Sequence, residues 1–167
     1  MIEITLFDST DEIVKACGYE PQFMDMPGAV SLIVPSDDWL LDDFFPYWLK
    51  WKTELGLEEG GRYQPGSGMC EWISRELLQR LAVCARKALP GRDVNPAAFE
   101  VRLGIPPGFV LNGVTDGGHA PILICTHDEN QARKWWILEA QSWTLADLRT
   151  PLKDALAGGC RLVTVVD

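Results

Sequence analysis

Cys70 follows a glycine-rich stretch, GGRYQPGSGM, and begins a pattern typical of a long helix. Ser67 suits the N-cap position, which predicts that Cys70 is the third helical residue. Unpaired N–H groups and the macrodipole at a helix N-terminus favour an anion, so we expect a lowered pKa for this thiol. A thiolate is the nucleophilic form, so the position suits covalent catalysis. The structural alternative is a small apolar residue packed under the helix start.

The chain has two histidines, His119 and His127. His119 follows Gly117 and Gly118, whose lack of side chains leaves room for a substrate to approach. His119 then precedes the apolar segment 121–126 (PILICT), so we expect it at the mouth of a strand. An ordinary loop histidine is the alternative. His127 falls in a predicted hairpin turn and is expected to be solvated.

A carboxylate and an amide come later, in the segment 135–143 (WWILEAQSW). Segments 121–126 and 135–140 predict an antiparallel hairpin around the polar turn HDENQAR. A turn centred on residue 129 would place Glu139 opposite His119, and one centred on residue 130 would place Gln141 there.

Both registers are feasible. Either Glu139 or Gln141 would bind one ring nitrogen of His119 and aim the other at the thiol. An exposed strand carboxylate is the alternative for Glu139. Together, the three segments supply a nucleophile, a base and an orienting group.

These segments resemble the papain-like cysteine peptidases. The helix-borne cysteine, the His-Ala pair at a strand start and WWILEAQSW are similar to that family's Cys, HA and YWxxKNSW segments. The resemblance implies a thiol peptidase or isopeptidase with Cys70 and His119 as catalytic residues and Gln141 in place of the family's asparagine. It also implies that Gln64, six residues before Cys70, supplies the oxyanion-hole side chain.

The fragment LEAQ is equally similar to the EPQ or DPQ endings of more distant relatives, among them transglutaminase-like proteins and the protease domain of fungal agglutinins. In those relatives an acid is the third member, which implies that role for Glu139. Transglutamination or deamidation would then use the same residues. We expect Trp72 or Trp143 to shield the site, with Gly68 and Gly118 beside the substrate.

The elements that must position these residues predict an α+β domain over residues 1–167. Residues 1–59 are expected to be mostly helical, with one helix starting at Ser36 and another running from Pro46 to a stop at Gly56. Residues 60–167 form the expected catalytic core, a long nucleophile-bearing helix packed on a small antiparallel sheet.

The apolar spacing of residues 70–89 predicts that long helix, ending at Pro90-Gly91. Residues 99–103 (FEVRL) are expected to form a strand, followed by a loop over GIPPGFVLNG. Thr144 or Thr150 is expected to cap a terminal helix through Ala157, and RLVTVV to form a last strand.

The amino-acid composition and the net charge exclude several classes of protein. The 167 residues are 47% hydrophobic and 23% charged, which excludes a disordered chain. The net charge of -9 argues against nucleic-acid binding, and no apolar run approaches a membrane span. The first residues lack a secretory pattern, so a cytoplasmic protein is expected. The expected partner is a polypeptide substrate or a basic protein.

Five cysteines and no CxxC argue against a disulfide framework and against a zinc site. We expect no metal and no cofactor, since no acidic loop has the spacing of an EF-hand. A second class of function stays open, in which an acidic chain with seven tryptophans is a non-catalytic binding or inhibitor protein.

Overall fold

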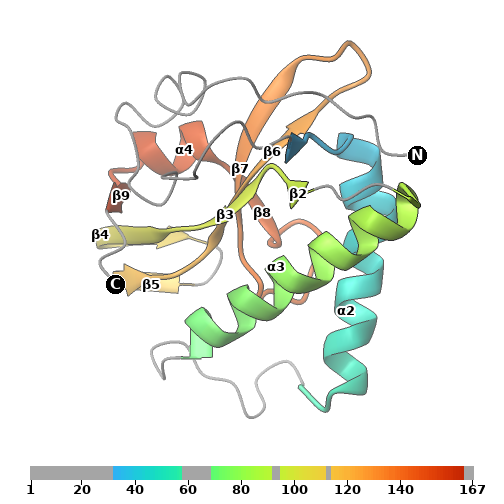
Figure 1. The fold of residues 1–167 in the computed structure, drawn as a ribbon. Helices are drawn as coiled ribbons and strands as arrows, with labels where there is room; N and C mark the ends of the chain where they lie inside the picture. Colours follow the sequence, from blue (N-terminus) through green and yellow to red (C-terminus); the bar gives the residue numbers. More distant parts are fainter. Residues whose placement is uncertain (1–31, 58–68, 92–94, 112–113, 164–167) are drawn as a thin grey trace.

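The computed structural model describes residues 32–57, 69–91, 95–111 and 114–163. These residues form a mixed α+β fold with a small antiparallel sheet and a few helices (Figure 1). The central sheet has the order β3-β6-β7-β8 and is antiparallel throughout. Its strands are β3 (Ala98–Glu100), β6 (Ile122–His127), β7 (Arg133–Leu138) and β8 (Arg149–Pro151).

A second antiparallel sheet has the order β5-β4-β9, from β4 (Arg102–Leu111), β5 (Val114–His119) and β9 (Arg161–Val163). The chain passes directly from one sheet into the other at Val101 and at Ala120-Pro121. The Val101 N–H donates to the Pro121 carbonyl at 3.1 Å, so the two crossings lie side by side. They form a seam at which β3 continues into β4 and β5 into β6.

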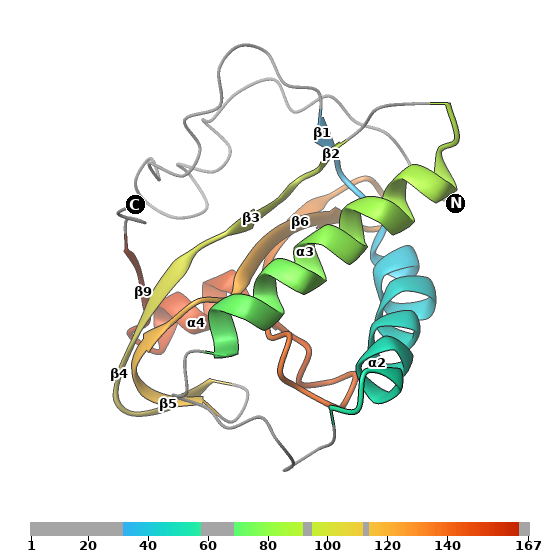
Figure 2. The same ribbon diagram turned by 60° about the horizontal axis from the view of Figure 1, so that its bottom comes forward.

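Both faces of the central sheet are buried. Along β6, Ile122 and Ile124 pack in the cluster that includes the helices α2 (Phe45–Glu54) and α3 (Met69–Ala88). Leu123 and Cys125 pack in the cluster that includes α4 (Leu152–Ala157). This alternation is the period of two expected for a strand. Figure 2 shows α3 lying across the sheet with α2 beside it.

Of the N-terminal part that was expected to be mostly helical, residues 1–31 lie outside the described residues, and the helix predicted at Ser36 is present. The Ser36 hydroxyl accepts from the Trp39 N–H at 3.1 Å, so Ser36 caps the helix start. The chain continues through the π-helical turn η2 (Trp39–Phe44) into α2 (Phe45–Glu54), with Pro46 in its first turn. Gly56 follows with φ +83°, a left-handed conformation that glycine adopts without strain.

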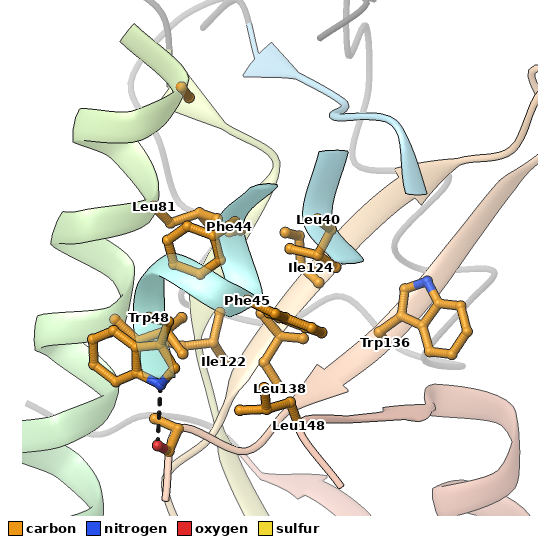
Figure 3. Packing of buried hydrophobic residues seen from close by; sticks show 14 of the residues in the cluster. Leu40, Phe44, Phe45, Trp48, Leu81, Ile122, Ile124, Trp136, Leu138 and Leu148 are labelled. Atoms are coloured by element: carbon orange, nitrogen blue, oxygen red, sulfur yellow. Dashed lines mark hydrogen bonds between the residues drawn. The ribbon is translucent and has the colours of Figure 1, made fainter. Parts of the chain in front are cut away.

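Helix α3 (Met69–Ala88) confirms the long amphipathic helix. Its fully buried apolar stripe consists of Ile73, Leu77, Leu81 and Ala85, whereas Cys84 and Ala88 are only partly buried. This stripe packs against Phe44 and Trp48 of the preceding helices and against the sheet, as Figure 3 shows for Leu81.

Two expectations for the later chain were wrong. The stretch predicted as a loop, GIPPGFVLNG, belongs largely to β4, whose pairing with β5 shifts between Ile105 and Val110. Pro106 and Pro107 lie in that irregular part, where missing N–H donors break no ladder bond.

Neither threonine caps the last helix, α4 (Leu152–Ala157). Pro151 occupies the N-cap position without a side-chain bond, and Thr150 lies in β8. The Thr144 hydroxyl instead accepts from the Asp147 N–H at 3.2 Å and closes an earlier turn. The predicted last strand is described as β9, and residues 164–166 lie outside the described residues.

A short parallel pair completes the fold. Strand β1 (Leu32–Ile33) pairs with β2 (Asn95–Pro96).

Candidate active site

His119 and Glu139 form a buried pair. Nε2 of the His119 imidazole bonds Oε2 of the Glu139 carboxylate. His119 is 4% exposed and Glu139 is 1% exposed. Burying an ionisable group costs free energy unless it is paired or hydrogen-bonded, so the contact satisfies a requirement of both side chains.

His119 is the last residue of β5, opposite Leu103 of β4. The next residue, Ala120, lies at the seam between the sheets. Its carbonyl accepts a 2.5 Å hydrogen bond from the buried hydroxyl of Ser74 in α3. The helix is therefore bonded to the backbone directly beside the imidazole.

Glu139 is the first residue after β7, and its position is fixed by several bonds. Its N–H donates to the Leu148 carbonyl at 2.8 Å, and its carbonyl accepts from the Ser142 N–H at 3.2 Å. Oε1 of its carboxylate accepts from the Gln141 N–H at 3.1 Å. Both carboxylate oxygens are thus engaged, one by the imidazole and one by the backbone.

Of the two predicted orienting residues, Glu139 is the one whose side chain contacts His119. The hairpin pairs Ile122 with Leu138, a register centred on residue 130, which by extension would have set Gln141 opposite His119. However, β7 ends at Leu138, and His119 belongs to the other sheet. Nε2 of Gln141 is buried and has no hydrogen-bond partner among the described residues.

Cys70 lies in the first turn of α3, which begins at Met69, and its side chain lies outside the described residues. Cys70 precedes Ser74 by four positions, and helical residues four apart share a face. Because Ser74 bonds Ala120, the backbone of α3 presents the face that includes position 70 to the strand end bearing His119.

An ion-pair network ties the start of α3 to the sheets. The Glu71 carboxylate binds the guanidinium of Arg102 at 3.0 Å and that of Arg75 at 2.5 Å. Glu100 binds the same two guanidiniums, at 3.2 Å to Arg102 and 3.3 Å to Arg75. Since Arg102 precedes Leu103, the partner of His119, this network joins the residue after Cys70 to the strand beside the imidazole.

The remaining predicted site residues are distributed around this centre. Gln64 and Gly68 lie outside the described residues. Gly118, in β5, pairs with Gly104 of β4. Trp72 lies on α3 and is 41% exposed. Trp143 is half-buried, with its ring centroid 4.3 Å from Nζ of Lys52.

Lys52 is a site residue that sequence reasoning missed. It is 1% exposed, and Nζ donates to the carbonyls of Ala140 at 2.9 Å and Ser142 at 2.5 Å. Burial lowers the pKa of Lys52 to about 8, and the Glu139 carboxylate opposes that shift.

A signal for Lys52 existed in the sequence. It follows Trp48 by four positions, so both side chains share a face of α2. Trp48 is fully buried, and its indole N–H donates to the Ala140 carbonyl at 3.2 Å, the bond dashed in Figure 3.

His127 is not solvated as predicted, because it is the buried last residue of β6 rather than part of the turn. Its Nδ1 lies 2.9 Å from the Asp128 carbonyl oxygen. The ring borders a hollow of about 400 Å³ lined by Ser36, Asp37, Asp38, His127, Asp128 and Glu129. This hollow lies at the opposite end of β6 from Ala120 and the candidate site.

Two other cysteines have thiols whose pKa is raised above the ordinary value. Burial raises the pKa of Cys84, although the nearby charges of Lys87 and Arg80 act to lower it. Burial also raises the pKa of Cys160. Within the described residues no group of three or more His, Cys, Asp or Glu side chains is placed to hold a metal ion.

Comparison with protein-family models, with curated proteins and with solved structures finds no match for this chain. In the described part of the chain, no helix combines the length and apolar character needed to span a bilayer. The case for a function therefore depends on the chemistry of the residues themselves.

Proposed function

We propose that this chain is a papain-like thiol hydrolase, a cysteine peptidase or isopeptidase. Cys70 is the nucleophile, His119 the general base and Glu139 the group that orients the imidazole. The observation that carries the proposal is the buried His119–Glu139 pair, next to a carbonyl that the cysteine-bearing helix binds through Ser74.

In the acylation step, Nδ1 of His119 takes the thiol proton, because Nε2 is engaged by Glu139. The Cys70 thiolate then attacks the substrate carbonyl carbon, and the carbonyl oxygen becomes an oxyanion. The imidazolium gives its proton to the leaving amine, the C–N bond breaks and a thioester remains on Cys70. Glu139 stabilises the positive charge that forms on the ring.

Deacylation repeats the chemistry with water as nucleophile. His119 removes a proton from water, the hydroxide attacks the thioester carbon, and the C–S bond breaks. The products are a carboxylic acid and the regenerated thiol. The resemblance assigns the oxyanion to Gln64 and the backbone N–H of Cys70, which fits the position of Cys70 in the first turn of α3.

Trp72 is a candidate for contacting the substrate. Its indole is 41% exposed and lies two positions after Cys70 on α3. An exposed apolar ring near the start of α3 offers a surface for an apolar substrate side chain.

The test is the rate of alkylation of each cysteine by iodoacetamide near pH 6, followed by mass spectrometry. We expect Cys70 to react far faster than the other four cysteines. Cys84 and Cys160 are internal controls, since burial raises their pKa. A Cys70 that reacts like a free thiol with a pKa of about 8.5 contradicts an activated nucleophile.

A second candidate, transglutamination or deamidation, is favoured by one observation. The group that contacts His119 is a carboxylate, as the resemblance to transglutaminase-like proteins implies. The thioester would form from a glutamine side chain with release of ammonia, and an amine or water would accept the acyl group. Incubating the protein with a glutamine peptide and an amine separates cleavage, deamidation and amine addition by mass.

The non-catalytic alternative makes a different prediction. If the chain were only a binding or inhibitor protein for a basic partner, Cys70→Ala would keep its biological activity. Under the proposed function, a folded Cys70→Ala protein loses activity and alkylation at that position together.

A further inference from the structure

Lys52 carries a charge into the protein interior beside the candidate site. It lies in α2, within the N-terminal part of the chain, yet both of its bonded carbonyls belong to residues that follow Glu139. A buried ammonium is costly unless opposite charge and acceptors surround it. The residues around Lys52 supply both.

Both hydrogen-bond acceptors of Lys52 lie in the segment that directly follows Glu139. Nζ bonds the carbonyls of Ala140 and Ser142, which bracket Gln141, the residue whose N–H binds the Glu139 carboxylate. Fixing these two carbonyls fixes the turn between them. The orientation of that turn decides where the Gln141 N–H points, and so where the carboxylate is held.

The positive charge of Lys52 acts on the Glu139 carboxylate as well. The Glu139 carboxylate is the anion that interacts electrostatically with Lys52. The rings of Trp48 and Trp143 lie 5.7 Å and 4.3 Å from Nζ, so aromatic faces line other sides of the ammonium. In this apolar surrounding the ammonium attracts the carboxylate more strongly than it would in water.

From these contacts we propose that Lys52 is a positioning residue, which holds the 139–142 turn and thereby keeps the Glu139 carboxylate directed at His119. The importance of this role for catalysis depends on the proposed function, while the effect on the His119–Glu139 bond does not.

The first test observes that bond by NMR in protein labelled with ¹⁵N-histidine. The parent protein is expected to show a strongly downfield imidazole N–H proton, assigned by its loss in His119→Ala. Lys52→Met, which keeps the length of the side chain without charge or donors, is expected to lose that signal while the fold persists. Lys50→Met removes an exposed charge from the same helix and is expected to keep it.

A matched variant separates the charge from a lost hydrogen bond. Trp48→Phe removes the other donor to the Ala140 carbonyl but leaves Lys52 in place, and is expected to keep the signal. If Lys52→Met does not fold, Lys52→Gln takes its place with the same expected loss. An unchanged signal in the folded Lys52 variant, or no such signal in the parent, overturns the positioning role.

The second test measures the alkylation of Cys70 near pH 6. Lys52→Met is expected to slow it by about tenfold or more, since a misdirected base activates the thiol less. If Cys70 is not activated even in the parent, the proposed function fails and the NMR result still decides the role of Lys52. If the parent is activated and Lys52→Met is equally fast, only the role of Lys52 is overturned.

Discussion

The imidazole of His119, the last residue of β5, bonds through Nε2 to the carboxylate of Glu139, the first residue after β7. The two residues lie at the ends of strands that belong to different sheets, and the chain crosses between the sheets directly after His119. The pair therefore depends on how the seam is packed. Ser74 and Lys52 hold the seam and the Glu139 segment from two helices.

Replacing Glu139 by glutamine should slow the alkylation of Cys70 near pH 6 by roughly 100-fold, measured by mass spectrometry. An amide keeps the shape of the side chain but does not carry the charge that stabilises an imidazolium. Gln141→Ala is the matched control, because the bond of Gln141 to the carboxylate comes from its backbone N–H. Equal effects of the two substitutions would contradict Glu139 as the orienting group.

Replacing Ser74 by alanine should lower the free energy of unfolding by about 1–2 kcal/mol, because the buried Ala120 carbonyl loses its donor. Urea unfolding measures this change. Thr53→Ala removes a comparable bond to the Leu49 carbonyl on an exposed helix surface and should cost less. On the proposed function, Ser74→Ala also slows Cys70 alkylation. A stable protein with unchanged alkylation would mean that the bond does not position the helix.

The stability contributed by Lys52 should depend on pH with a defined sign. Its pKa is about 8 in the folded protein and 10.5 in the unfolded chain, so the unfolded chain holds more protons between these values. The free energy of unfolding of the parent should therefore rise relative to Lys52→Met by about 3 kcal/mol from pH 8 to 10.5.

Denaturant unfolding at several pH values measures this difference. The exposed Lys50→Met variant should show no such rise relative to the parent. A parent-to-Lys52→Met difference that is constant across the range would show that Lys52 keeps an ordinary pKa.

Replacing Leu81 by alanine should cost about 2–5 kcal/mol, since Leu81 is fully buried between α3 and the sheet and leaves a cavity. Val83→Ala, two positions along the same helix, removes a side chain that is 37% exposed and should cost about 0.5 kcal/mol or less. Urea midpoints of the two variants provide the comparison. Similar costs would mean that the packing of α3 on the sheet is looser than described.

Local patterns accounted for the elements that carry the candidate residues. The apolar stripe of α3, the cap at Ser36, the stop at Gly56 and the hairpin of β6 and β7 each depend on a few neighbouring residues. The α+β class followed from their order along the chain. Such features are decided by helical and strand periodicity and by turn chemistry, which are visible in a single sequence.

The missed features depend on contacts between distant segments. The register of the hairpin alone could not identify Glu139 as the partner of His119. Extended to His119, that register points to Gln141, but His119 belongs to the other sheet and is not paired with the hairpin. Lys52 lies on the buried face of α2, but only the tertiary fold shows that two backbone carbonyls accept hydrogen bonds from it there. A charged residue on an apolar stripe was the available sign.

The bond from Lys52 to Ala140 joins residues 88 positions apart in the chain. A growing polypeptide leaves the ribosome from its N-terminus, so the helix start with Cys70 emerges well before His119 and Glu139. On the proposed function, the thiol of an unfinished chain is chemically ordinary. On the same proposal, the nucleophile becomes reactive only after most of the chain has been made.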